Sequence, residues 1–278
     1  MPDTTNGVAG SPSLEYPDYW WYRVRSQLLR VVFAGYVHER DRVLDVGSAD
    51  GPSVQWMPGG RRVALDLDPR GLRPGDVCGS AGHLPFADHS FDVVVAFDVL
   101  EHCRDETAAV SELTRVLRPA GRLLLSTPAY QWAWTSFDED VGHYRRYTRD
   151  RLTAATARAG LRIDRSTYAF TATFPLFVAE RLVRRIRQHR GLDATGLPQV
   201  PGWLDKLLVR LASFDAVLLQ HRDLPYGSSV LVAATRPERP SAPEREQAVA
   251  HEAQHDRDTE DDHLSGQHRS ADLLHRGR

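Results

Sequence analysis

The apolar residues of this chain gather in short runs separated by amphipathic segments, from about residue 19 to residue 235. Runs with a strand's length that are rich in Val, Leu, Ala and Phe predict buried strands at 42–46, 62–67, 91–97, 121–126, 161–168 and 230–234. Apolar residues at helical spacing predict helices at 19–38, 108–117 and 149–159. We therefore expect strands and helices to alternate along most of the chain.

This alternation predicts an α/β fold, with a mostly parallel sheet and helices on both of its faces. At about 170–224 it is interrupted by two helical patterns where a short turn would suffice. The first contains the arginine-rich stretch 176–190, and the second covers 204–219. We expect a helical lid inserted before the last strand. An apolar face buried as a cap and a basic face resting on anionic lipid both explain the pattern of the first helix.

The two ends of the chain differ from its middle in composition. Residues 1–18 are rich in Pro, Gly, Ser and Thr and are expected to form a disordered lead. Residues 236–278 contain no Phe, Trp or Tyr and abound in charged residues, His, Ser and Pro. Such a segment buries too little apolar surface to offset the entropy of ordering, so we expect a disordered tail and one folded domain at 19–235.

Charge and cysteine content narrow the class of protein. The formal net charge is −2, so no overall basic field favours nucleic-acid binding. Two cysteines are too few for a disulfide framework. The first residues lack the features of a secretory signal, and no stretch reaches roughly 18 uncharged apolar residues. We expect a cytoplasmic protein.

The segment from Val43 to Gly51 combines the end of a strand with a turn of small residues, followed by Pro52, which suits a first helical position. Gly47, Ala49 and Gly51 allow the backbone to approach a ligand closely. The next strand ends at Asp66, whose carboxylate can accept both hydroxyls of a ribose. A glycine turn followed by such an acid predicts a nucleoside-binding crevice at the carboxyl edge of the sheet.

Two other interpretations of this turn remain open. A dinucleotide site needs glycines spaced G-x-G-x-x-G, and the corresponding positions here are Gly47, Ala49 and Pro52. This spacing favours a nucleoside without a pyrophosphate, so a nicotinamide-dependent oxidoreductase is the alternative enzyme. A strand–turn–helix without any ligand is the other alternative.

Four ordered motifs resemble the class I methyltransferases of the type 11 family: LDVGSADG, ALDLDP, the LPF…SFD stretch, and VLEH followed by VLRPAGR. The resemblance covers about residues 19–170 and implies a Rossmann-like fold with S-adenosylmethionine as cofactor. Residues at the crevice are then expected to contact it. Gly47, Ser48, Ala49 and Gly51 would lie along its methionine and ribose portions, Asp45 near its amino group, Asp66 on the ribose, Leu67 against the adenine, and Ala81, Phe97 and Asp98 around it.

One position departs from the family pattern. The acidic residue expected before Ala81 is replaced by Ser80, which offers the adenine amine only a hydroxyl oxygen. This replacement is the sequence feature that keeps a non-catalytic binding module of methyltransferase type as an alternative. The stretch 68–79 is also too short for a full helix, so we expect a loop there.

Methyl transfer from a sulfonium requires alignment of the nucleophile and sometimes removal of one proton. Asp98, Glu101 and His102 follow the predicted strand 91–97, and His102 is a candidate general base or a packed, capping residue. Residues 127–148, called loop 127–148 here, follow the predicted strand 121–126 and combine aromatic and charged side chains. We expect His143 to act as a base or to orient the acceptor, with Asp138 or Glu139 as its partner. In the alternative, the loop is structural and its arginines pair with Asp138–Asp140.

Loop 127–148 also resembles a D-E-x-x-G-H-x-R-R-Y-T stretch of methyltransferase-domain proteins in sugar and polysaccharide pathways. The resemblance implies a small-molecule, sugar or lipid-linked glycan acceptor, methylated on oxygen or nitrogen. Peripheral membrane contact through the basic helix 176–190 would accompany a lipid-linked acceptor.

Overall fold

The structure is a computed structural model, and it describes residues 18–47, 52–58, 61–191 and 200–238. The chain divides into two compact units, Met1–Pro237 and Glu238–Arg278. All helices and strands described below belong to the first unit. The predicted lead and most of the predicted tail lie outside the described residues.

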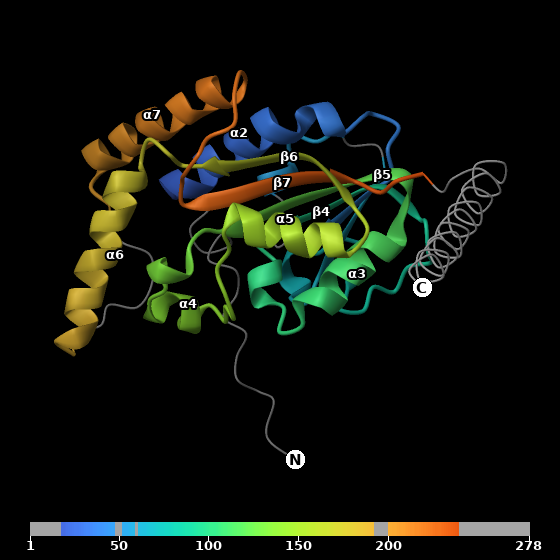
Figure 1. The fold of residues 1–278 in the computed structure, drawn as a ribbon, viewed down its shortest axis with the longest axis horizontal. Coiled ribbons are helices and arrows are strands. Elements are labelled where there is room, and N and C mark those ends of the chain that lie inside the picture. Colours follow the sequence, from blue (N-terminus) through green and yellow to red (C-terminus); the bar gives the residue numbers. More distant parts are fainter. Residues whose placement is uncertain (1–17, 48–51, 59–60, 192–199, 239–278) are drawn as a thin grey trace, which may run out of the picture. The chain divides into compact units, whose positions relative to one another are not determined.

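The first unit is built on one seven-stranded sheet, with the strand order β3-β2-β1-β4-β5-β7-β6 (Figure 1). The strands are β1 (Val43–Val46), β2 (Arg62–Asp66), β3 (Val77–Cys78), β4 (Phe91–Phe97), β5 (Leu117–Pro128), β6 (Arg162–Ala169) and β7 (Ser229–Thr235). Strands β1 to β5 pair in parallel, whereas β7 runs antiparallel to both β5 and β6. The mostly parallel sheet is as predicted.

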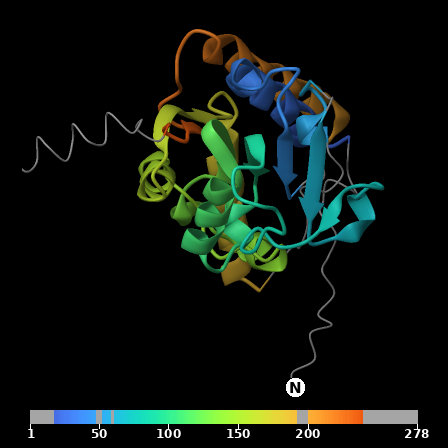
Figure 2. The ribbon, with the colours of Figure 1, turned by 90° about the vertical axis from the view of Figure 1, so that its right-hand side faces the viewer.

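Helices cover both faces of the sheet (Figure 2). They are α2 (Trp20–Phe33), α3 (Glu106–Val116), α4 (Ser136–Asp140), α5 (Arg149–Arg158), α6 (Phe174–His189) and α7 (Gly202–Leu219). Helices α2 and α7 pack against one face in one buried apolar cluster, and α3 and α5 pack against the other. Successive residues of β4 and β5 contribute to opposite clusters, which explains why their apolar runs are continuous in sequence.

Several boundaries differ from the expected ones. Strand β5 begins at Leu117 and not at Gly121. Its residues Leu117–Ala120 follow directly on the end of α3 at Val116. The stretch 68–79 is a loop that also contains a 3-10 turn, Pro69–Gly71, and the short strand β3, which the sequence did not indicate. The helix expected at 19–38 ends at Phe33 and continues only as a 3-10 turn, Ala34–Tyr36.

The clearest difference between the structure and the sequence prediction is at the helix expected after the glycine turn. Pro52 opens only a 3-10 turn, Pro52–Val54, in place of a long α-helix. The sequence explains this, because Pro58 and the Gly59–Gly60 pair follow at once, and proline and glycine end helices. Among the described residues, the structure thus confirms the strand that ends at Val46 but has a 3-10 turn where the helix was expected.

The folded unit also extends slightly beyond its expected end at residue 235. The backbone N–H of Arg236 donates to the carbonyl of Gly121 over 2.8 Å, and its guanidinium donates to the carbonyls of Thr114 and Leu117, each over 2.7 Å. These bonds attach Arg236 to the ends of α3 and β5. The predicted boundary at 236 is therefore too early by at least this residue.

The two helices of the insertion are present as α6 and α7. Helix α7 packs on α2 through residues such as Ala212, Ala216 and Leu219. Helix α6 has no buried residue and lies toward α4 in Figure 1. That the two helices act as a lid remains a prediction. No helix in the described ranges is long and apolar enough to cross a membrane.

Candidate active site

The carboxyl ends of β1 and β2 form the first part of the candidate site. Gly47 follows β1 with a positive φ of 71°, and a Cβ added there would lie 2.4 Å from Cγ2 of Val99. Its N–H donates to the carbonyl of Leu65 over 2.7 Å, which ties the turn to β2. Only glycine satisfies both the dihedral angle and the close approach. Asp45 lies in β1, two positions before Gly47, and is buried. Ser48, Ala49 and Gly51 lie outside the described residues.

Asp66 and Leu67 lie at the same edge. The Oδ1 atom of Asp66 accepts a hydrogen bond from the N–H of Asp68 over 2.9 Å, which orients the carboxylate at the end of β2. The side chain of Leu67 is 69% exposed, so an apolar surface is open to a ligand at this edge. Ser80 is exposed after β3, and Ala81 beside it is buried. An acid, an open apolar side chain and a glycine at one edge fit the ribose, adenine and methionine portions of S-adenosylmethionine.

Asp98, at the end of β4, is held by residues from two other elements. Arg25 of α2 forms an ion pair with its Oδ2 over 2.9 Å, and Ser126 of β5 donates to its Oδ1 over the same distance. Arg25 is buried and also lies over the ring of Trp21. Phe97, which precedes Asp98, is buried against Phe33. The sequence did not single out Arg25, because α2 lies far from this strand along the chain.

Three non-glycine residues at this edge adopt the left-handed backbone conformation. They are Asp98, Tyr130 and Phe170, with φ of 57°, 62° and 64°, and each follows the end of a strand. Such backbone conformations cost free energy and tend to occur at functional sites. All three strands, β4, β5 and β6, end at the same edge of the sheet. Two further residues with positive φ, His89 and Ala120, lie near the other end of β4 and β5, so three of the five such residues in the described ranges are at this edge.

Backbone hydrogen bonds join the two ends of loop 127–148. The N–H of Tyr130 donates to the carbonyl of Tyr147 over 2.7 Å, and the N–H of Tyr147 donates to the carbonyl of Pro128 over 2.9 Å. Between these points, the short helix α4 begins with a capping box formed by Thr135 and Asp138. Tyr147 itself is fully buried. The loop is consequently a fixed part of the site.

Within the loop, Asp138 is fully buried and holds both His143 and Arg146. Its Oδ1 lies 2.9 Å from Nδ1 of His143 and 2.7 Å from Nη2 of Arg146. Burial alone would raise the pKa of Asp138, but the hydrogen bonds from His143 and Arg146 and the charge of Arg146 lower this pKa to about 2. Asp138 is thus an anion that fixes the ring of His143.

Both interpretations of the loop have support in this geometry. His143 has Asp138 as partner, as one interpretation expected, and Arg146 pairs with the same carboxylate, as the structural alternative expected. Glu139, the other expected partner of His143, instead accepts from Nε1 of Trp134. Arg145 pairs with Glu106 over 3.8 Å and not with the acidic residues 138–140.

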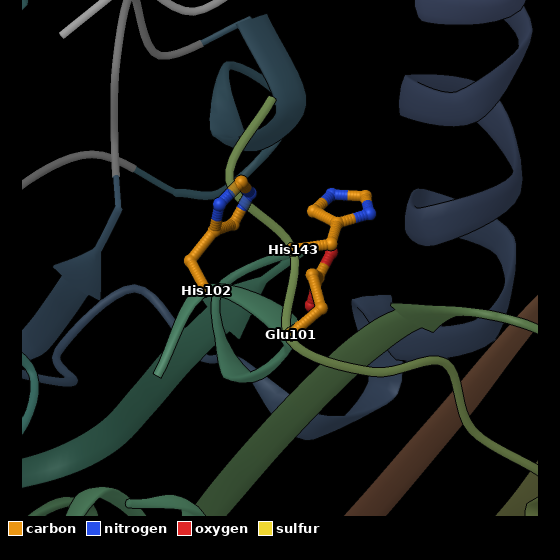
Figure 3. Close-up of side chains that lie close together, drawn as sticks. All are labelled: Glu101, His102 and His143. Atoms are coloured by element: carbon orange, nitrogen blue, oxygen red, sulfur yellow. The ribbon is translucent and has the colours of Figure 1, made fainter. Parts of the chain in front are cut away.

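Glu101 and His102 lie opposite His143 (Figure 3). They end the 3-10 turn Leu100–His102 after β4, and their potential ligand atoms and one of His143 all lie within 4.8 Å of one another. The rings of His102 and His143 meet edge to face, with centroids 4.6 Å apart. Burial, to which the charge of Asp98 adds, raises the pKa of Glu101. Desolvation and the neighbouring His143 lower the pKa of His102 to about 4, although His102 keeps an exposed portion at the rim.

An aromatic wall stands beside this cluster. The ring of Tyr130 stacks with those of Trp132 and Tyr168, and Phe174 of α6 contacts both Tyr130 and Tyr226. Trp132 and Tyr226 are 44% and 46% exposed. Helix α6 is attached to the loop by Arg181, which donates to Oγ1 of Thr135 over 2.8 Å, and by Arg185, which donates to the carbonyl of Trp132. The carboxyl edge of the sheet thus carries buried polar groups around His143 and exposed aromatic rings from loop 127–148 and its neighbours.

Comparison with known proteins identifies the family of this chain. Residues 44–125 match the family described as "Methyltransferase domain". An uncharacterized methyltransferase of Mycolicibacterium gilvum is 31% identical over 240 residues, which cover 76% of this chain and 86% of the relative. A probable S-adenosylmethionine-dependent methyltransferase of Mycobacterium tuberculosis is 29% identical over 84% of this chain and 90% of its own length.

Solved structures agree on the fold. A SAM-dependent methyltransferase of Thermotoga maritima superimposes with a TM-score of 0.52 at 14% identity, covering 81% of this chain and 97% of that one. A SAM-dependent methyltransferase of Archaeoglobus fulgidus gives a TM-score of 0.51 at 16% identity, with 80% and 98% covered. The family match and the relatives named as methyltransferases set aside the nicotinamide oxidoreductase and the non-catalytic module. The chain belongs to the class I S-adenosylmethionine-dependent methyltransferases, with S-adenosylmethionine as its cofactor.

Proposed function

We propose that this methyltransferase transfers the methyl group to an oxygen or nitrogen of a small-molecule, sugar or lipid-linked glycan acceptor, with a hydroxyl oxygen as the preferred target. The buried Asp138 that orients His143 at the crevice carries this proposal. A hydroxyl is a weak nucleophile unless its proton is removed as it attacks, and an oriented imidazole performs that task. S-adenosylmethionine supplies the methyl group.

On the cofactor side, we assign binding to the residues at the ends of β1, β2 and β4. Asp66 accepts hydrogen bonds from the ribose, Leu67 covers the adenine, and Asp45 with Gly47 lines the methionine portion, together with Ser48, Ala49 and Gly51. Ser80 and Ala81 flank the adenine, and Phe97 and Asp98 close the crevice. The support is their position along one sheet edge, with the glycine approach at Gly47.

On the acceptor side, we assign His143 and His102 to the nucleophilic atom and Asp138 to the positioning of His143. The aromatic wall supports an acceptor with broad, weakly polar faces, such as a sugar ring, because exposed aromatic faces beside a few polar groups are typical of such sites. Trp132 and Tyr226 offer the open rings.

The outward side of α6 supports presentation of the acceptor at a membrane. Leu182, Val183 and Ile186 are each more than half exposed, and Arg187 and Arg190 are exposed beside them. Arg181 and Arg185 point instead toward loop 127–148, so the basic residues divide between the two sides of the helix. An exposed apolar strip with flanking arginines is complementary to an anionic lipid surface.

A methyl-transfer screen tests the acceptor assignment. The full chain and S-adenosylmethionine are incubated with free sugars, with sugars linked to a polyprenyl phosphate in anionic vesicles, and with small amines, and methylated products are identified by mass spectrometry. We expect O-methylated sugar, with the vesicle-bound substrate preferred. Methylation confined to the amines would overturn the oxygen preference, and equal rates for free and vesicle-bound sugar would overturn membrane presentation.

A further inference from the structure

Glu101 has an unusual environment for a carboxylate. Its side chain is fully buried, and neither carboxylate oxygen has a hydrogen-bond partner among the described residues. A buried carboxylate is strongly destabilising unless it is paired, protonated or bound to a cation. The guanidinium of Arg146 is already engaged by Asp138, and that of Arg25 by Asp98. The environment of Glu101 therefore has a place for a positive charge that these two arginines do not fill.

The two histidines facing Glu101 are oriented by outer groups. Nδ1 of His143 is hydrogen-bonded to Asp138, which leaves Nε2 as its ligand atom. His102 is hydrogen-bonded to the backbone of Val141 and Gly142. Histidines that ligate metals almost always have the second ring position fixed by a carboxylate or a backbone carbonyl in this way.

The backbone around the cluster holds its members together. The N–H of Tyr144 donates to the carbonyl of Glu101 over 2.7 Å, so the residue after His143 is bonded to the turn that contains the other two. The three ligand atoms lie within 4.8 Å of one another. Tetrahedral bonds of about 2.1 Å place ligand atoms about 3.4 Å apart, so small side-chain rotations complete the site.

We propose that Glu101, His102 and His143 bind one divalent transition-metal ion, with Zn²⁺ as the fitting ion. Two imidazoles and one carboxylate form the donor set of catalytic zinc sites, which keep a fourth position open. The exposed portion of His102 lies at the rim, so the open position faces the crevice. The fully buried Glu101 lies on the inner side.

This inference rests on the proposed function, because the open position is assigned to the hydroxyl of the acceptor. When the hydroxyl oxygen binds the ion, the O–H bond ionises and its proton leaves to water. The oxygen then forms the C–O bond to the methyl group while the S–C bond breaks, and the sulfur keeps that electron pair as the thioether of S-adenosylhomocysteine. In the metal-loaded protein, His143 is a ligand, and Asp138 is the residue that positions it.

Metal binding is measured directly, without methyl transfer. Chelator-treated full-length protein is titrated with Co²⁺ as a visible-absorbance probe for Zn²⁺. The background variant carries Gln at the tail histidines, which could bind metal themselves: His251, His255, His263, His268 and His275. We expect one Co²⁺ per chain and an absorbance typical of tetrahedral coordination. A His83→Gln control, which changes an exposed histidine outside the cluster, should bind Co²⁺ as the background variant does. Saturation without a specific absorbance change, or no Co²⁺ binding by the background variant, would overturn the proposal.

Glu101→Gln is the decisive variant, because it preserves shape while removing the charge. We expect at least about 100-fold weaker Co²⁺ binding, beyond the roughly 10- to 100-fold cost of losing a group that only orients a ligand. Thermal unfolding separates metal binding from a folding defect: Zn²⁺ should raise the melting temperature of the parent protein and leave that of Glu101→Gln unchanged. An equal rise in both proteins contradicts the assigned ligand.

The outcomes for metal and for acceptor are distinguishable. If chelated protein methylates a hydroxyl acceptor at the full rate and binds no Co²⁺, the metal proposal fails and the proposed function stands. If Co²⁺ binds with the expected dependence on Glu101 but no hydroxyl acceptor is methylated, the proposed function fails and the metal site stands.

Discussion

The two sides of the crevice are constructed from different parts of the chain. On the cofactor side, Gly47, Asp66 and Leu67 follow two adjacent strands and lie close together in sequence. On the acceptor side, Glu101 and His102 meet His143 from loop 127–148, and α6 adds Arg181 and Arg185 from further along the chain. The shape of the proposed cofactor side is set by backbone geometry, whereas the arrangement of the proposed acceptor side is set by buried charged groups.

This difference implies different responses to substitution. A change on the cofactor side should alter cofactor affinity while leaving the rest of the fold stable. A change in the buried charges of loop 127–148 should destabilise the fold locally and remove acceptor chemistry, with cofactor affinity retained. The following variants test this contrast in order of expected effect.

The largest effect is expected for Asp138→Asn. This change leaves the buried guanidinium of Arg146 without its anionic partner, and breaking a buried ion pair typically costs about 3–5 kcal/mol of unfolding free energy. Glu139→Gln, at an exposed neighbouring position, should change the unfolding free energy by less than about 0.5 kcal/mol. Chemical denaturation measures both. Similar small losses in the two variants would show that the loop does not depend on its buried charge.

Gly47→Ala should have the next largest effect. The added Cβ meets Val99 at 2.4 Å and displaces the turn, so we expect affinity for S-adenosylhomocysteine to fall by about 100-fold or more. Gly160→Ala is the matched control, because Gly160 also has a positive φ but nothing within 4 Å of its Cβ position. Both variants should lose about 1–2 kcal/mol of stability through backbone strain. Only Gly47→Ala should lose calorimetric binding; equal binding by both would contradict the assignment of the turn.

Asp66→Asn tests the ribose contact with a smaller expected effect. Hydrogen bonds to a charged acceptor contribute about 1.5–3 kcal/mol, which corresponds to roughly 10- to 150-fold weaker S-adenosylhomocysteine binding. Asp88→Asn is a suitable control, because Asp88 is an exposed carboxylate paired with Arg115 away from the crevice. If Asp66→Asn bound S-adenosylhomocysteine with unchanged affinity, the assignment of Asp66 to the ribose would be wrong.

The smallest effect is expected on α6. Removing Arg187 and Arg190 by substitution with Gln should weaken co-sedimentation with anionic vesicles by roughly 5- to 30-fold, at about 1 kcal/mol for each basic residue near the surface. Arg162→Gln, an exposed arginine on β6, serves as the comparison. Both cofactor affinity and stability should stay unchanged. Equal vesicle binding by all three proteins would leave the outer side of α6 without a role at membranes.

The positions of Gly47 and Asp66, which we propose to bind the cofactor, could be predicted largely from the sequence. Apolar runs such as Val93–Ala96 locate buried strands, and a turn residue that follows a strand necessarily lies at the carboxyl edge. Local spacing therefore places Gly47 and Asp66 together without any knowledge of packing. The short strand β3 escaped prediction because two residues carry no detectable period.

The acceptor side could be predicted only in part. Loop 127–148 was recognisable from its composition, but the choice of Asp138 over Glu139 as the partner of His143 depends on the capping of α4. The ion pair of Arg25 with Asp98 joins two elements that are distant in sequence, so no local pattern encodes it. Glu101 is fully buried and its carbonyl accepts a hydrogen bond from the N–H of Tyr144 in loop 127–148, a contact between distant segments that no local pattern encodes.

The position of Arg25 links the fluorescence of Trp21 to the carboxylate of Asp98. Its guanidinium lies 5.3 Å from the centre of the Trp21 ring and is bonded to Asp98 in the crevice. A positive charge over an indole influences its fluorescence, so a ligand that draws Asp98 and Arg25 away also alters the emission of Trp21. Ligand binding near Asp98 can thus be followed by the intrinsic tryptophan fluorescence of α2, without any added dye.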